Sequence, residues 1–269
     1  MVPACGHDQI GDLPVASIDT PLVLKVLQPI WERIPDTASR LRGRIERVLA
    51  FATVREYRSG DNPARWRGHL KEMFPTKGKQ ENLPALPFEQ LPAFMAALRD
   101  TDKPTARALE FTILTAARTG EVIKADWSEI DLNAKTWTIP AERMKAEEEH
   151  IVPLSDRAVE ILRSLPTEEG RVFHLGHNAM WDLMKAMRAD CTVHGFRSSF
   201  RDWAGDRTAY PHDVIEFALA HKIPDRASAA YRRYRALDKR RRLMADWSTY
   251  CATGPKLSQN VVAIGGKRR

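Results

Sequence analysis

The residues best suited to chemistry lie in one strongly basic segment near the carboxyl end of the chain. His221 and Tyr231 stand ten positions apart there, and the tyrosine runs directly into paired arginines. Residues 222–242 hold nine Lys or Arg and two Asp, a local charge of 9 − 2 = +7, and the whole chain sums to 42 − 35 = +7. Such concentrated charge favours docking of a polyanion, and a tyrosine within it suggests chemistry on phosphate. The alternative is a basic solvated helix that carries an ordinary core tyrosine.

Two other short motifs supply arginine. In Arg118-Thr119-Gly120-Glu121 the acid can orient the guanidinium, and in His194-Gly195-Phe196-Arg197 the histidine and arginine can face one side of a helix start. Attack on a phosphodiester builds negative charge on oxygens that are already anionic, and the arginine fork matches two such oxygens. Each motif alone occurs by chance in helical proteins, but this order within one chain favours a phosphate site.

Other routes to phosphate chemistry find no support in the sequence. It contains no P-loop pattern and no compact carboxylate cluster of the kind that holds two metals. Cys191 and His194 are three residues apart, but two ligands do not make a zinc site. We therefore expect no metal and no other cofactor, so arginines and histidines must carry the chemistry.

The elements that position these residues are predicted to be mostly helices. Apolar periodicity places them at 21–27, from Asp36 or Thr37 to Ala52, at 87–99, from Pro104 to Thr119-Gly120, at 155–165 and over most of 178–250. Residues 130–132, 136–140 and 150–154 are short β-like runs separated by turns. The predicted fold class is mainly α with a small antiparallel β-sheet.

Proline, glycine and lysine gather at 75–87, which predicts a linker between two units. We therefore expect a helical domain at 1–74, a second domain at 88–253 and a disordered polar tail at 254–269. In the first domain, Trp66 lies between two arginines and is better explained as a core residue than as a platform for a base. Arg40, Arg42, Arg44 and Arg47 give its long helix a second basic surface.

Composition narrows the class of protein. No apolar run approaches the roughly 20 residues that a membrane span requires, and no signal peptide is evident at the N-terminus. The three cysteines form no CxxC pair, which indicates a reducing cytoplasm. A pI near 9.4 supports a nucleic-acid partner.

Four segments together resemble the tyrosine recombinases, and within them the phage and genomic-island integrases. They are Ala-Arg-Thr-Gly-Glu at 117–121, His-Gly-Phe-Arg at 194–197, Leu-Ala-His at 219–221 and Ala-Ala-Tyr-Arg-Arg at 229–233. The resemblance runs from about Leu13 to Tyr250 and implies a recombinase catalytic domain at 88–253, preceded by a partial helical core-DNA-binding domain. Because it begins so late, it also suggests an N-terminally truncated protein, in which the stripe of Leu41, Ile45 and Val48 lacks packing partners and is exposed.

The resemblance implies a role for each motif residue. Tyr231 would attack the scissile phosphate and form a 3′-phosphotyrosyl bond, with Tyr234 as the competing tyrosine. Arg118 and Arg197 would clamp the non-bridging oxygens. His194 would help to remove the tyrosine proton.

His221 would hydrogen-bond the phosphate, and Glu121 would hold Arg118. A lysine on the β-hairpin would protonate the leaving 5′-oxygen. Lys145 matches it, although three glutamates follow at 147–149 where relatives carry basic residues, and Lys135 is its rival.

The same resemblance implies the partners. They are double-stranded DNA at attachment sites, three further copies of the chain in a synaptic homotetramer, and an accessory DNA-bending or excision factor. The free protein is expected to be a monomer in the bacterial cytoplasm, associated with the nucleoid and not with a membrane. The main alternative is a catalytically idle DNA-binding remnant of an integrase. A type IB topoisomerase and an RNA-binding protein are more distant alternatives.

Overall fold

The computed structural model describes residues 7–74, 84–166, 169–187, 190–221 and 236–254. The chain divides into two compact units, Met1–Glu81 and Asn82–Arg269, and each has a hydrophobic core of its own. Residues 75–83 of the expected linker lie outside the described part of the chain. Among the helices that the structure describes, none combines the length and the apolar character needed to cross a membrane.

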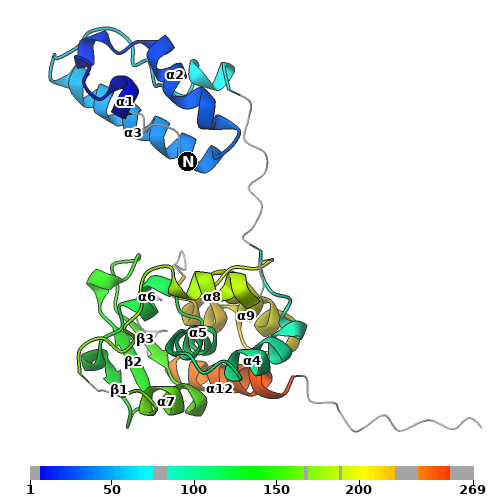
Figure 1. Ribbon diagram of the computed structural model, residues 1–269. Coiled ribbons are helices and arrows are strands. Elements are labelled where there is room, and N and C mark those ends of the chain that lie inside the picture. Colours follow the sequence, from blue (N-terminus) through cyan, green and yellow to red (C-terminus); the bar gives the residue numbers. More distant parts are fainter. Residues whose placement is uncertain (1–6, 75–83, 167–168, 188–189, 222–235, 255–269) are drawn as a thin grey trace, which may run out of the picture. The chain divides into compact units, whose positions relative to one another are not determined.

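The first unit is helical (Figure 1). Its elements are α1 (His7–Ile10), η1 (Val15–Ser17), α2 (Thr20–Trp31), α3 (Pro35–Val54) and η2 (Leu70–Glu72). The side chain of Asp19 caps α2 by accepting a hydrogen bond from the Leu22 amide at 3.0 Å. Helix α2 is longer than the predicted 21–27, and α3 begins at Pro35 without a side-chain cap from Ile34.

The apolar stripe of α3 is mostly covered. Ile45 is buried and Leu41 packs against the core of the first unit, whereas Val48 is 61% exposed. The prediction of an exposed stripe is therefore wrong except at Val48, because α2 and residues 64–74 provide partners for that side of α3. Trp66 is partly buried and packs against this core, and its ring stacks on Trp31 with centroids 5.4 Å apart. This favours its interpretation as a packing residue.

The second unit combines helices with one small sheet. Its helices are η3 (Phe88–Gln90), α4 (Leu91–Arg99), α5 (Pro104–Thr115), α6 (Thr119–Ile123), η4 (Trp127–Glu129), η5 (Ala141–Arg143), α7 (Asp156–Arg163), α8 (Ala179–Met187), α9 (Gly195–Arg207), α10 (His212–Ala218) and α12 (Leu237–Thr253). Its strands are β1 (Ile130–Asp131), β2 (Thr136–Ile139) and β3 (His150–Pro153), antiparallel in the order β1-β2-β3. The predicted fold class is confirmed.

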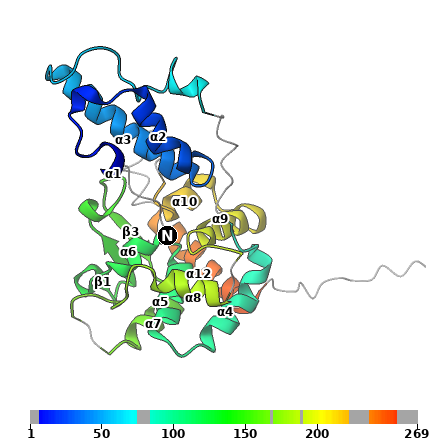
Figure 2. The same cartoon turned by 45° about the horizontal axis from the view of Figure 1, so that its top comes forward.

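Helix α5 is the central element of the second unit. Every residue from Ala108 to Thr115 is buried, and α12 is fixed to it by the indole of Trp247, which donates to the Ile113 carbonyl at 2.8 Å. The small sheet lies at one end of this unit and α4 at the other in both views (Figures 1 and 2). Leu86, within the expected linker, is buried in the same core.

Helix α5 ends earlier than its periodicity predicts. Ala116 adopts φ 49°, in the left-handed region, and stops the helix after Thr115. Thr119 and Gly120, which were expected to end α5, instead begin α6, with Arg118 at its N-cap. This early stop turns the chain so that Arg118 leaves the buried helix.

Candidate active site

Arg118 is held by one carboxylate. Its backbone amide donates to Glu121 Oε2 at 2.8 Å, and its Nη1 donates to Glu121 Oε1 at 2.7 Å. The Glu121 side chain is only 7% exposed, whereas that of Arg118 is 26% exposed. A guanidinium oriented from behind in this way still reaches solvent, where it can meet an anion.

Arg197 is buried between the carboxyl ends of two helices. Its Nη1 donates to the Ala116 carbonyl at the end of α5, and its Nη2 donates to the Leu219 carbonyl at the end of α10 at 2.6 Å. Helix carboxyl ends carry partial negative charge, which stabilises a cation there. Burial, with the positive charge of Arg118 added, lowers the pKa of Arg197 to about 10, so that the guanidinium remains charged at neutral pH.

His221 lies between Arg197 and a buried glutamate. Its Nε2 is 3.3 Å from Arg197 Nη2, and its Nδ1 is 2.6 Å from Glu216 Oε2. The other oxygen of Glu216 accepts a hydrogen bond from Arg201 Nε at 2.7 Å. The histidine ring is thus fixed on both sides.

His194 stands at the start of α9 and is close to the same charges. Loss of water around the ring lowers the pKa of His194, and the charges of Arg197, Arg118 and His221 lower it further.

Position 195, directly after His194, requires glycine, because a Cβ on Gly195 would lie 2.3 Å from the Pro84 carbonyl oxygen. The close approach of these two backbones fixes where α9 begins.

Sequence reasoning placed His150 in a strand but gave it no role. Burial and the charges of Arg240, Arg197 and Arg118 lower the pKa of His150 to about 3, and its ring hydrogen-bonds the Ala218 backbone. The next residue of β3, Ile151, accepts a hydrogen bond from Arg240 Nη1 through its carbonyl at 2.7 Å. An uncharged imidazole and a further buried arginine therefore belong to this cluster.

The two candidate lysines lie at opposite ends of strand β2. Lys145 is exposed in the loop between β2 and β3, next to the end where Ile139 pairs with His150. Lys135 lies before β2, and its Nζ is 2.6 Å from Asp156 Oδ1. Tyr231 lies in 222–235, outside the described residues.

Four of the six predicted catalytic residues are therefore brought together from three separate segments. Arg118, His194, Arg197 and His221 interact through their charges around one point of the second unit. Two guanidiniums and two imidazoles around one point can hold the oxygens of a tetrahedral anion. Such a cluster of cationic and polar groups is suited to an anion such as phosphate.

Two family models match the chain in sequence. The model described as "Phage integrase central domain" matches residues 7–69, and the one described as "Phage integrase family" matches residues 84–241. The chain belongs to the phage integrase family. This confirms the resemblance to integrases and assigns the four-residue cluster to the part matched by the second model.

Curated relatives include two from Escherichia coli (strain K12). The prophage integrase IntA is 33% identical over 89% of this chain and 60% of its own length. The prophage integrase IntZ is 31% identical over 89% of this chain and 61% of its own length. The chain thus spans about three fifths of these relatives.

Among known structures, the fold is similar to that of DNA-bound integrases. A lambda integrase tetramer bound to a Holliday junction aligns with a TM-score of 0.61 at 16% identity, over 82% of this chain and 69% of that one. The Tn1549 transposon integrase (aa 82-397) in complex with circular intermediate DNA gives 0.55 at 12% identity, over 86% and 88%. The chain therefore has the tyrosine recombinase fold.

Sequence reasoning missed three members of this integrase cluster: Glu216, His150 and Arg240. Glu216 is five residues before His221, on a helix whose buried face begins at Val214. An acid in an apolar stretch such as Ile215-Glu216-Phe217-Ala218 was the available signal, because buried carboxylates need partners. His150 and Arg240 carried no comparable signal, since their proximity depends on how α12 packs on β3.

Proposed function

We propose that this chain is a site-specific DNA recombinase that cleaves and rejoins DNA through a 3′-phosphotyrosyl intermediate. The observation that carries the proposal is the convergence of Arg118, Arg197, His194 and His221 on one point of an integrase catalytic unit. A polyanionic substrate also fits a chain with a pI near 9.4. Membership of the integrase family supplies the reaction class.

The two arginines act on the phosphate. A phosphodiester under attack gains charge on its non-bridging oxygens, and donors fixed beforehand stabilise that charge without reorganising. Arg197 is fixed by two helix ends and Arg118 by Glu121. Both therefore meet the phosphate as rigid cations.

The tyrosine nucleophile needs help to lose its proton, because a free phenol has a pKa of about 10. Tyr231 is the proposed nucleophile and His194 the group that accepts its proton. The lowered pKa of His194 keeps its ring neutral at pH 7 and able to accept. His221 supports the phosphate site through Arg197, whose Nη2 lies 3.3 Å from its Nε2.

The strand register supports Lys145 over Lys135 as the acid for the leaving 5′-oxygen. His150, which interacts with both arginines, pairs with Ile139 at the end of β2 that leads into the Lys145 loop. Lys135 precedes the other end of β2 and is engaged by Asp156.

The phosphotyrosyl bond keeps the energy of the broken phosphodiester, so strands can be rejoined without a nucleotide cofactor or a metal. Double-stranded DNA at attachment sites is the proposed substrate. A homotetramer is the proposed synaptic assembly, helped by an accessory DNA-bending or excision factor. In the first unit, which we propose to be a core-DNA-binding domain, Arg40, Arg44 and Arg47 of α3 offer cations for the DNA backbone.

The experiment is a cleavage assay on a nicked suicide DNA that traps the covalent intermediate. The whole chain should give an adduct on denaturing gels, Tyr231→Phe should give none, and Tyr234→Phe should leave the adduct in place. DNA binding without any adduct would instead support the idle DNA-binding remnant. An adduct lost only in Tyr234→Phe would identify the other tyrosine as the nucleophile.

A further inference from the structure

Glu216 is a buried carboxylate directly behind His221. It lies on α10, and the residue is 9% exposed. Its Oε2 is 2.6 Å from His221 Nδ1, while its Oε1 is 2.7 Å from Arg201 Nε and 3.6 Å from His212 Nε2. Burial raises the pKa of Glu216, but the hydrogen bonds from His221 and Arg201 outweigh it and hold that pKa below its ordinary value. The carboxylate is therefore ionised at neutral pH.

An ionised carboxylate can only accept hydrogen bonds, and this decides which ring nitrogen of His221 carries the proton. Nδ1 must donate to Glu216, so the neutral ring has a bare Nε2. That atom accepts from Arg197 Nη2, 3.3 Å away. Nε2 consequently faces the arginine that we assign to the phosphate.

We propose that Glu216 is a positioning residue, which fixes the Nδ1–H form of His221 and so keeps its bare Nε2 as the acceptor that holds Arg197 at the phosphate site. The inference rests on the proposed recombinase function. Without the carboxylate, the ring can exchange its tautomers and turn, and Nε2 is no longer held beside the arginine. Partners of this kind behind functional histidines set both tautomer and orientation.

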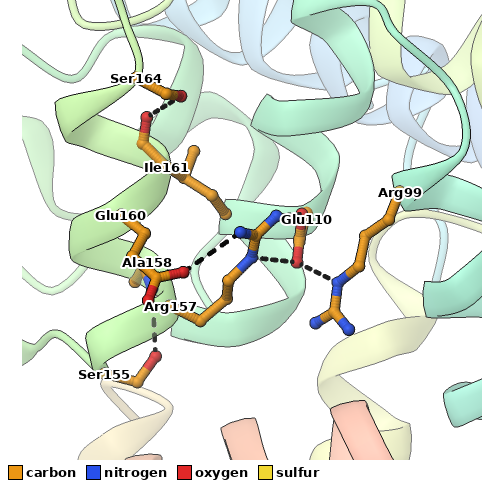
Figure 3. A network of polar contacts seen from close by, with 8 residues as sticks. All are labelled: Arg99, Glu110, Ser155, Arg157, Ala158, Glu160, Ile161 and Ser164. Atoms are coloured by element: carbon orange, nitrogen blue, oxygen red, sulfur yellow. Dashed lines mark hydrogen bonds and ion pairs between the residues drawn. The ribbon is translucent and has the colours of Figure 1, made fainter.

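A matched control is available in Glu110, a second buried glutamate in the same unit. Its Oε1 accepts from Arg99 Nε at 2.7 Å and from Arg157 Nε at 2.9 Å, as Figure 3 shows. Glu110 is 2% exposed, and within that network its carboxylate accepts hydrogen bonds only from arginines. Replacing it by Gln removes a buried charge as Glu216→Gln does, but without touching a histidine.

The test is a double-mutant cycle on the rate of adduct formation at saturating nicked DNA. Glu216→Gln should slow the rate about 10- to 100-fold, as is typical when the outer partner of a functional histidine is removed. DNA affinity should stay within about threefold. In a His221→Ala background the same change should slow the rate less than about twofold, because Glu216 acts through the missing ring. Glu110→Gln should have the same small effect in both backgrounds.

An equal loss from Glu216→Gln with and without His221 would overturn the inference, because Glu216 would then act elsewhere. Nitrogen-15 spectra of the whole chain provide a second readout that needs no activity, with the His221 signals assigned from His221→Ala. The neutral ring should be the Nδ1–H form in the wild type and a mixture in Glu216→Gln. A bare Nδ1 in the wild type would also overturn it.

The two readouts separate this inference from the recombinase proposal. If the wild type forms no adduct, the recombinase proposal fails and the spectra alone decide on Glu216. If the adduct forms but the cycle is additive, only the role of Glu216 fails.

Discussion

His150 should make the second unit lose stability as the pH falls below neutral. Its pKa is lowered from 6.5 to about 3 in the folded chain, first by burial and then by Arg240, Arg197 and Arg118. Between these values the unfolded chain binds a proton that the folded chain does not, so the free energy of unfolding rises with pH in that window. The contribution of His150 to the free energy of unfolding is fully present above pH 6.5 and is lost as the pH falls from 6.5 towards 3.

The size of the effect follows from the two pKa values. Between pH 7 and pH 5 an unfolded histidine takes up about three quarters of a proton, while the folded one with a pKa of about 3 takes up almost none. The difference amounts to about 2 kcal/mol. His150→Gln removes this titration, and the neutral amide can still donate to the Ala218 backbone.

The assay is equilibrium urea unfolding of wild type and His150→Gln at pH 7 and pH 5. Wild type should lose about 2 kcal/mol more than the variant between the two pH values. His177→Gln is the matched control, since His177 is an exposed histidine of the same unit, and it should behave as the wild type does. The same pH dependence in His150→Gln and wild type would refute the argument that the arginine cluster excludes a charged ring.

Three further predictions concern separate features. Arg118→Ala should slow adduct formation about 10²- to 10³-fold at saturating DNA, with little loss of DNA affinity. A loss of DNA affinity in titrations, with an unchanged rate at saturating DNA, would show that Arg118 only binds the phosphate. Ala220→Gly should raise the free energy of unfolding by about 0.5–1 kcal/mol in urea titrations, because Ala220 has φ 50°, in the left-handed region that favours glycine. An unchanged or lower free energy of unfolding would contradict this. Ala218→Gly, inside α10, is the control and should destabilise the chain. Trp31→Ala should destabilise the first unit by about 3–5 kcal/mol, since Trp31 is 4% exposed and stacks on Phe74; hydrogen exchange should quicken in that unit, and equal quickening in the second unit would contradict the separate cores.

The elements predicted best from the sequence are those specified by local signals. The three strands lie where β-branched and aromatic runs predict them, and Ser155 caps α7 as expected, accepting from the Ala158 amide at 3.4 Å. The end of α5 was misplaced because its apolar period continues past Thr115. The chain stops there through a left-handed alanine, a residue type that gives no such signal.

The candidate site divides in the same way. Arg118, His194, Arg197 and His221 could be predicted because each lies in a short motif, and the order of the motifs indicated one site. Glu121 was predicted to hold Arg118 and does so, but the partners of Arg197 could not be predicted, since they come from distant turns. The carbonyl of Ala116 reaches Arg197 across 81 positions, and that of Leu219 across 22.

The structure also distinguishes two arginines that the sequence treats alike. Arg197 is 6% exposed and donates to two helix carboxyl ends, so packing of α5, α9 and α10 sets its position before any ligand arrives. Arg118 depends on Glu121 alone among the contacts described for its side chain, and it remains 26% exposed. A perturbation of α10 should therefore displace Arg197 and His221 together but leave Arg118 in place. The two halves of the proposed phosphate clamp can thus be disturbed separately, one through the packing of helices and the other through a single carboxylate.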